Sequence, residues 1–465
     1  MPGCPSPARA GAGAAMTGVS LSRWTMSYFA AALFALVAAE VLMVAGYGFP
    51  NDPLRSPQTL VVVHLVAIGW LSLLMCGALF QFVPVLIARP LYSNALPLPT
   101  LLCLLAGVAM LLLGFMQLAG QIDPGPPFLA LAAALLGVGF ALVLWNLGRT
   151  LLQVRPPLPA QLVVVGLVSL AATAVYGIIF ALVLGGFVDH EPCVSIAASG
   201  VPLHAIAGLG GWLTFTAVGV SYRLLAMFML APELDNWRNR AVLYIGSSAL
   251  AVVILGGAAA IRLGFEINFV LGLAGVLGLA TITLYGADVV HLFRARKRRN
   301  IELNSRMAAF ALASLVASAV LIVVLIVLGR LSDHVGAVVF LVAFGWLSGL
   351  GLAKLYKIIA FLTWLECYGP VLGKAVTPRV QDLVVEKRAY KWFAVYFLAV
   401  WIGTIALLVE HASHFQIAAA GMLVGTLGII AQLVRSRRLA DVAAERRIPE
   451  GACRPRLLLS LARPN

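Results

Sequence analysis

Histidine is the side chain through which this sequence is best equipped to do chemistry, and seven are present. A neutral imidazole is a common protein ligand for haem iron, copper and zinc. His64 and His204 lie inside long apolar stretches, where a polar side chain is costly unless it has a partner. We therefore predict that His64 and His204 bind a haem, a copper ion or both. His334, His411 and His414 are further candidate metal ligands, and the sequence assigns no catalytic residue.

Each histidine also has a simpler interpretation. A histidine near the end of a membrane helix is often an interfacial residue whose ring bonds a carbonyl group or water. This interpretation suits His190, His411 and His414, which lie in or beside polar loops. It suits His64 less well, because that residue stands within the apolar run VVVHLV.

The apolar stretches at His64 and His204, and a third one after His334, share a short motif. Each contains a Gly-Trp pair followed two positions later by a hydroxyl side chain: Gly69, Trp70 and Ser72; Gly211, Trp212 and Thr214; Gly345, Trp346 and Ser348. The three motifs are about one third of the chain apart, and a fixed period of this kind indicates structural repeats. Glycine lets helices approach closely. The three tryptophans are candidate cofactor-binding residues, and packing is the alternative role for each.

Composition shows which elements must position these residues. The chain is 62% hydrophobic and 11% charged, with a mean hydropathy of +1.00. A soluble protein of this length needs more charge to cover its surface. We therefore predict an all-α, polytopic membrane protein. Its twelve expected spans are residues 24–46, 61–84, 97–119, 127–150, 160–187, 202–230, 240–261, 266–291, 305–328, 336–364, 391–410 and 415–434.

The twelve spans divide into three pseudo-symmetric arcs of four helices, with the Gly-Trp helix second in each. The predicted organisation begins with a cytoplasmic leader at 1–23, in which Met16 is an alternative start. One transmembrane domain follows at 24–434, with repeats over about 24–152, 160–293 and 305–434. A mobile, basic cytoplasmic tail is expected at 435–465. A single transmembrane domain is expected to contain all three repeats. The repeats are therefore expected to pack together as one unit.

The basic residues predict the orientation. With the N-terminus in the cytoplasm, all but three of the 32 Lys and Arg residues fall on the cytoplasmic side; the exceptions are Arg55, Arg262 and Arg330. This bias predicts that both termini lie in the cytoplasm. The expected location is the bacterial inner membrane. The formal charge of +14 is then explained by contact with anionic lipid headgroups, and not by nucleic acid.

The same orientation places every histidine except His291 near the outer face of the membrane. Three other polar residues in the spans need an explanation. Lys354 and Lys357 lie one turn apart near the inner face, and snorkelling toward headgroups accounts for both. Glu40 needs a partner such as Arg55, Arg262 or a histidine, and protonation is the alternative.

The predicted architecture resembles the catalytic subunit of the haem-copper oxidases. The segment H-L-x-x-x-G-W from His64 to Trp70 is similar to the helix that carries a low-spin haem ligand in that superfamily. His204 falls where the superfamily places a copper ligand. The resemblance implies twelve helices in three arcs, with haem and copper as cofactors.

The departures from that pattern are specific. The seventh span, 240–261, has no histidine, whereas the oxidases place a His-His pair there; the tenth has none after His334. A complete oxygen-reducing binuclear centre is therefore not expected. The chain more closely resembles degenerate relatives of the NnrS type, which bind haem and copper and are linked to nitric-oxide stress.

Three functions are compatible with these residues. The first is a haem- or copper-binding membrane protein that is not an oxidase, with a redox partner or a small gas as its ligand. The second is a redox enzyme for nitric oxide, oxygen or quinol, which would need His334, His411 or His414 as extra ligands. The third is a cofactor-free transporter or assembly factor.

The positions of His64 and His204 relative to the motif differ. When the two helices are aligned on Gly-Trp, the histidines are offset by about half a helical turn. This offset favours two separate sites, and not one symmetric pair.

Overall fold

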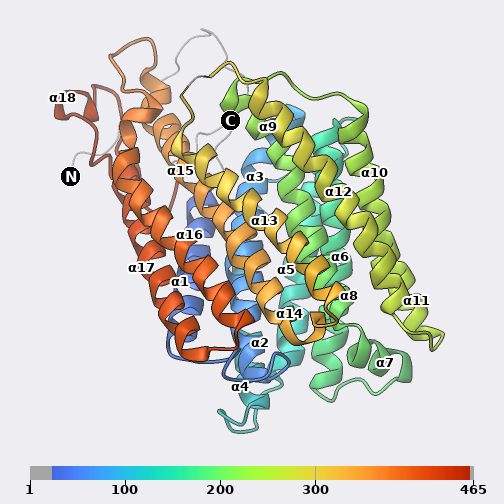
Figure 1. Ribbon diagram of the computed structural model, residues 1–465. Helices are drawn as coiled ribbons and strands as arrows, with labels where there is room; N and C mark the ends of the chain where they lie inside the picture. Colours follow the sequence, from blue (N-terminus) through green and yellow to red (C-terminus); the bar gives the residue numbers. More distant parts are fainter. Residues whose placement is uncertain (1–22, 299, 461–465) are drawn as a thin grey trace.

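The computed structural model describes residues 23–298 and 300–460, and these form an all-α, multi-pass membrane protein. Twelve helical segments are long and apolar enough to span a membrane, as the sequence predicted. Figure 1 shows the long helices lying side by side, with α18 at one end of the bundle and α7 at the other. We call the end with the start of α1 and the end of α17 the terminal face, and the opposite end the histidine face.

The bounds of the helices define the twelve spans. In chain order the elements are α1 (Thr25–Val44), α2 (Pro57–His64), η1 (Leu65–Ser72), α3 (Leu73–Ile87), α4 (Pro97–Leu118), α5 (Phe128–Leu151), α6 (Leu158–Leu184), α7 (Glu191–Ser199), α8 (Val201–Ala205), η2 (Ile206–Phe215), α9 (Thr216–Met229), α10 (Trp237–Ala251), η3 (Val252–Gly256), α11 (Gly257–Arg262), α12 (Asn268–Arg294), α13 (Leu303–Val327), α14 (Leu331–Phe340), η4 (Leu341–Ser348), α15 (Gly349–Tyr368), η5 (Gly369–Val371), η6 (Val380–Leu383), α16 (Glu386–Leu408), α17 (Ala412–Arg437) and α18 (Ala444–Arg447). The second, sixth, seventh and tenth spans are each made of consecutive α and π segments. The short α7 lies in a connection where the sequence predicted only a loop.

The six spans that end at the histidine face stop in the same way. The second residue past each helix adopts a left-handed conformation: Gly46, Gly120, Gly186, Gly264, Gly329 and Glu410. The next residue then donates a backbone hydrogen bond into the last turn, as Tyr47 N–H does to the Leu42 carbonyl at 2.9 Å. This arrangement satisfies carbonyl groups that the helix end would leave unpaired. Glycine adopts the left-handed conformation without strain, so Glu410 is the exception among the six.

The three Gly-Trp helices each contain a π-helical segment at the motif, namely η1, η2 and η4. All three pairs of these segments are in contact, so the Gly-Trp helices meet one another inside the bundle. The motif glycine of each helix packs against the first helix of its own repeat. An added Cβ at Gly69, Gly211 or Gly345 would lie only 2.9, 2.4 or 2.8 Å from a side-chain atom of that neighbour. The glycines therefore permit the close approach that the sequence suggested.

Helices α1 and α17 pack against each other and so join the first repeat to the last. Glu40 is fully buried at this contact, where its Oε1 accepts a hydrogen bond of 2.8 Å from the Thr426 hydroxyl. The sequence had suggested Arg55, Arg262 or a histidine as its partner. The bonded partner is instead a hydroxyl from the twelfth span, which no local pattern indicates.

The C-terminal segment packs against the bundle. Residues 438–460 return to the bundle: Ser460 N–H donates to the Arg23 carbonyl at 3.0 Å, and the Ser27 hydroxyl donates to the Leu458 carbonyl at 2.7 Å. These bonds hold the segment against α1, whereas the sequence predicted a mobile tail from residue 435. The predicted leader lies outside the described residues, apart from Arg23.

Candidate metal site

His64 and His204 lie next to each other at the histidine face. Their ring centroids are 6.4 Å apart and their planes are inclined by 30°. His64 is the last residue of α2 and His204 lies in α8, so each precedes the π segment of its Gly-Trp helix. Both side chains are partly buried. The structure thus brings together the two principal ligand candidates from different repeats.

Hydrogen bonds fix the orientation of both imidazole rings. Nδ1 of His64 lies 2.9 Å from the Leu60 carbonyl oxygen, and Nδ1 of His204 lies 3.1 Å from the Thr173 carbonyl oxygen. A carbonyl oxygen only accepts, so each Nδ1 carries the proton and each Nε2 of the neutral ring has an available lone pair. Within the described residues neither Nε2 has a hydrogen-bond partner. This is the arrangement in which a histidine is held ready to bind a metal.

The distance of 6.4 Å between the two ring centroids can be compared with the spacing of two imidazoles that share one metal ion. A metal–nitrogen bond is about 2.0 Å long, so an ion between the two Nε2 atoms would hold the ring centroids about 6 Å apart. The Phe115 and His64 rings are 5.0 Å apart, and the Phe180 and His204 rings are 5.4 Å apart. Aromatic side chains therefore pack against both imidazoles.

The other candidate ligands lie elsewhere. His411 and His414 form an exposed pair with ring centroids 5.1 Å apart at the start of α17. His334 is buried within α14 at a residue with non-helical backbone angles, and His190 is exposed before α7. No three His, Cys, Asp or Glu side chains among the described residues converge on one metal position. The structure therefore gives the redox-enzyme hypothesis no third ligand beside His64 and His204.

The three motif tryptophans form a closed ring of hydrogen bonds between the Gly-Trp helices. The indole N–H of Trp70 donates to the Ser348 hydroxyl at 2.8 Å, that of Trp346 to Thr214 at 3.2 Å, and that of Trp212 to Ser72 at 3.0 Å. All three indoles are buried. These bonds support the packing role and place the tryptophans in equivalent positions of the three repeats. Their role in binding a cofactor stays a prediction.

The offset between His64 and His204 has a geometric cause that the sequence alignment hides. Two helices related by a threefold rotation face each other with different sides, as in a head-to-tail interface. Residues at non-equivalent positions of the motif therefore meet across the interface, as Trp212 meets Ser72. The half-turn offset that predicted separate sites is what lets the two rings approach each other.

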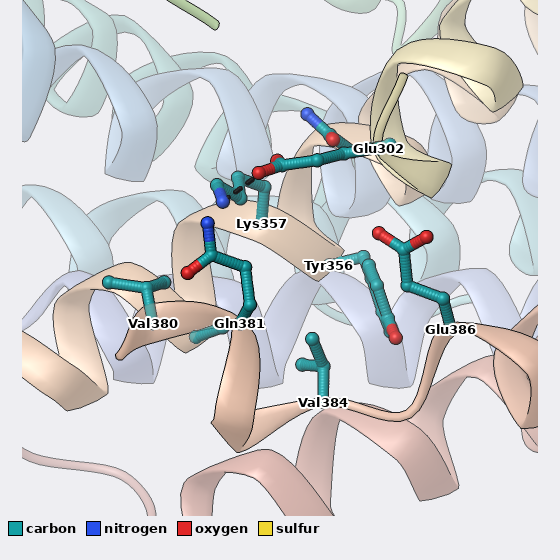
Figure 2. Close-up of a pocket in the computed structure, with 9 residues that line it drawn as sticks. Glu302, Tyr356, Lys357, Val380, Gln381, Val384 and Glu386 are labelled. Carbon is teal, nitrogen blue, oxygen red and sulfur yellow. Dashed lines mark ion pairs between the residues drawn. The ribbon is translucent and has the colours of Figure 1, made fainter. Parts of the chain in front are cut away.

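Charged residues at the terminal face are paired in a way the sequence did not reveal. Figure 2 shows a small pocket where the Lys357 ammonium group points to the Glu302 carboxylate, with Glu386 and Tyr356 nearby. The Lys357–Glu302 ion pair is 2.8 Å long and both side chains are mostly buried. Lys354 is also buried, with its Nζ above the Phe228 ring at 5.6 Å from the centroid. Snorkelling is therefore the wrong explanation for both lysines.

The pocket of Figure 2 has the size of a water site. Its volume is about 10 Å³, which is room for about one water molecule. Both polar atoms of the buried Asn304 amide and the Tyr356 hydroxyl lack a hydrogen-bond partner in the described part of the chain. A water there would have polar groups to bond, but the pocket is too small for a cofactor.

The second, sixth and tenth spans meet inside the bundle. The histidine pair joins the second and sixth spans directly. No protein-family model matches this chain, and no curated protein matches its sequence. The relationship to the oxidases and to NnrS-type proteins therefore stays a prediction.

Proposed function

We propose that this protein is a copper-binding membrane protein whose metal site is the His64–His204 pair, and that it is not a complete oxidase. The protein would lie in the bacterial inner membrane with both termini in the cytoplasm, as the distribution of its basic residues favours. A copper ion at the histidine face would then be near the outer surface. There it can exchange electrons with a redox partner or bind a small gas such as nitric oxide.

One observation carries this proposal. Two imidazoles from different repeats approach to a ring distance of 6.4 Å, and each has its Nδ1 committed to a backbone carbonyl. An isolated histidine at a helix end needs neither a second histidine nor a fixed Nε2. Imidazole nitrogen suits copper, iron, zinc and nickel, and copper(II) binds most tightly of the divalent metals in the usual order.

The test is metal and haem analysis of the detergent-purified, membrane-inserted protein. We expect about one copper per chain, and at least a tenfold loss of bound copper in His64→Ala and in His204→Ala, because removing either ligand leaves a single nitrogen donor. His291→Ala is the matched control: this histidine is exposed at the terminal face, and its removal should leave the copper content unchanged.

Other outcomes separate the alternatives. If wild type contains haem and both site variants lack it, the cofactor of the His64–His204 pair is haem and not copper. A wild-type protein that binds neither after reconstitution with copper and with haem would contradict the proposal and favour a cofactor-free transporter or assembly factor. Full metal retention in both variants would place the metal at another site and refute the assignment to His64 and His204.

A further inference from the structure

The second feature of interest is a basic pocket at the terminal face, far from the histidine pair. It has a volume of about 400 Å³. Its lining residues are Arg437, Arg438, Leu439, Arg447, Ile448, Arg454 and Pro455. Four of these seven side chains are guanidinium groups and none is a carboxylate. The pocket lies where α17 ends and the chain turns back toward α1.

Only one of the four arginines has a carboxylate partner among the described residues. Arg437 is paired with Glu366 at 2.7 Å, and both side chains are buried. Arg438 and Arg454 are exposed and make neither an ion pair nor a side-chain hydrogen bond within residues 23–298 and 300–460. Arg447 donates to a backbone carbonyl but to no carboxylate. Three positive charges therefore meet at one pocket without a counter-charge from the described chain.

The pocket is held in shape by hydrogen bonds. Arg437 donates from Nε to the Arg456 carbonyl at 2.8 Å and from Nη2 to the Leu459 carbonyl at 3.2 Å. The Tyr368 hydroxyl donates to the Arg447 carbonyl at 2.8 Å. Arg447 donates from Nε and Nη2 to the Val442 carbonyl, which fixes its guanidinium plane. The buried Arg437 thus ties the returning segment to α17, and the other arginines are presented on that segment.

The nearby carboxylate of Asp441 is already committed elsewhere. It accepts bonds of 2.7 Å from Arg388 and 2.6 Å from Arg435. Burial alone would raise the pKa of Asp441, but the hydrogen bonds from these two arginines outweigh it and hold the pKa below its usual value. Asp441 is therefore ionised at neutral pH, and its single charge is shared between Arg388 and Arg435.

We propose that this pocket binds a phosphate-bearing anion, supplied either by the headgroup of an anionic phospholipid or by free phosphate. Guanidinium groups bind phosphate oxygens through paired, charge-assisted hydrogen bonds. The pocket lies at the end of α17, a helix long and apolar enough to span a membrane. Ile448, which is exposed, also lines the pocket and offers apolar contact to an acyl chain. The anion would stabilise the returned segment by neutralising the three converging charges.

The test measures binding to full-length, delipidated protein in a neutral detergent by native mass spectrometry. The probes are short-chain phosphatidylglycerol, short-chain phosphatidylcholine and inorganic phosphate. We expect phosphatidylglycerol to bind at least tenfold more weakly to the double variant Arg438→Gln/Arg454→Gln than to wild type. Arg437 and Arg447 stay in place, because they hold the segment.

The matched control is Arg89→Gln/Arg155→Gln, which removes the same charge from exposed loop residues of the terminal face. It should bind phosphatidylglycerol like wild type, and all three proteins should have similar melting temperatures without lipid. Inorganic phosphate that competes at equal concentration would identify free phosphate as the ligand; no competition would identify the lipid. Equal binding of phosphatidylcholine, equal loss in both double variants, or no binding of either phosphate probe would overturn the proposal.

Discussion

The tryptophan ring and the histidine pair lie on the same helices, yet only one of them follows the symmetry of the repeats. The ring takes an equivalent donor and an equivalent acceptor from each Gly-Trp helix. The histidine pair takes His64 and His204 from two of the helices, and the tenth span offers no histidine beside them. Both nevertheless join different repeats through residues at non-equivalent positions of the motif.

The difference separates two demands on the sequence. Packing three similar helices around one axis is the same task in each repeat, so the same residues perform it three times. A metal needs ligands at one place only, so the residues that bind it must differ between repeats. Where the repeats agree we expect a role in stability, and where a buried polar residue breaks the agreement we expect a role in function.

The largest expected effect comes from breaking the ring. Trp70→Ala should lower the free energy of unfolding by about 3–5 kcal/mol, because it leaves a cavity at a fully buried site. Unfolding followed in lipid nanodiscs measures this change. Trp145→Ala is the control, since Trp145 is 56% exposed and its removal should cost much less. Bound copper per folded molecule should not change in Trp70→Ala, and its loss would show that the ring also serves the metal site.

A smaller effect tests how nearly equal the three links of the ring are. Ser72→Ala, Thr214→Val and Ser348→Ala each remove the acceptor of a buried indole N–H, which should cost about 1–3 kcal/mol. Thr214→Val should cost least, because its bond of 3.2 Å is the longest. Thr283→Val, an exposed hydroxyl bonded only within its own helix, is the control. The same unfolding assay measures all three variants. A ring with three equivalent links would be contradicted if only one of the three substitutions lowered the free energy of unfolding.

The smallest effect comes from restoring symmetry at the histidine face. Glu410→Gly should raise the free energy of unfolding by up to about 1 kcal/mol, because Glu410 alone of the six helix-ending residues is a non-glycine in the left-handed conformation. Its ion pair with Arg330 is 3.9 Å long and exposed, so little is lost. Gly264→Ala makes the reverse change in open space and should destabilise. Destabilisation by Glu410→Gly would mean that the Arg330 contact matters more than the backbone.

The sequence predicted the elements of the fold but few of the contacts between repeats. Hydropathy located all twelve spans, and the recurring Gly-Trp motif located the helices that meet inside the bundle. Both are local signals that depend on neighbouring residues. The boundaries of the sixteenth helix, α16, were less accurate: it begins at Glu386, five residues before the predicted start.

The candidate site shows why the remaining contacts were missed. The sequence identified His64 and His204 but did not predict that their rings lie next to each other, because it compared equivalent positions of helices that contact each other through non-equivalent faces. The partners of Glu40, Lys357 and Arg437 are hydroxyl or carboxylate groups on other helices. Neither hydropathy nor helical period carries information on such pairs, since both describe one helix at a time.

The hydrogen bond between Glu40 and Thr426 bears on the order in which the protein is assembled. The two residues are 386 positions apart, so Glu40 enters the membrane long before its partner has been synthesised. A carboxyl group inside the bilayer is costly without a partner. Glu40 is the only buried carboxyl group among the described residues of α1. It therefore gains its hydrogen-bond partner only when the last helix is inserted. Synthesis of the C-terminal span thus completes the environment of the N-terminal one. A ribosome-bound chain that ends before α17 lacks the Thr426 hydroxyl that bonds Glu40.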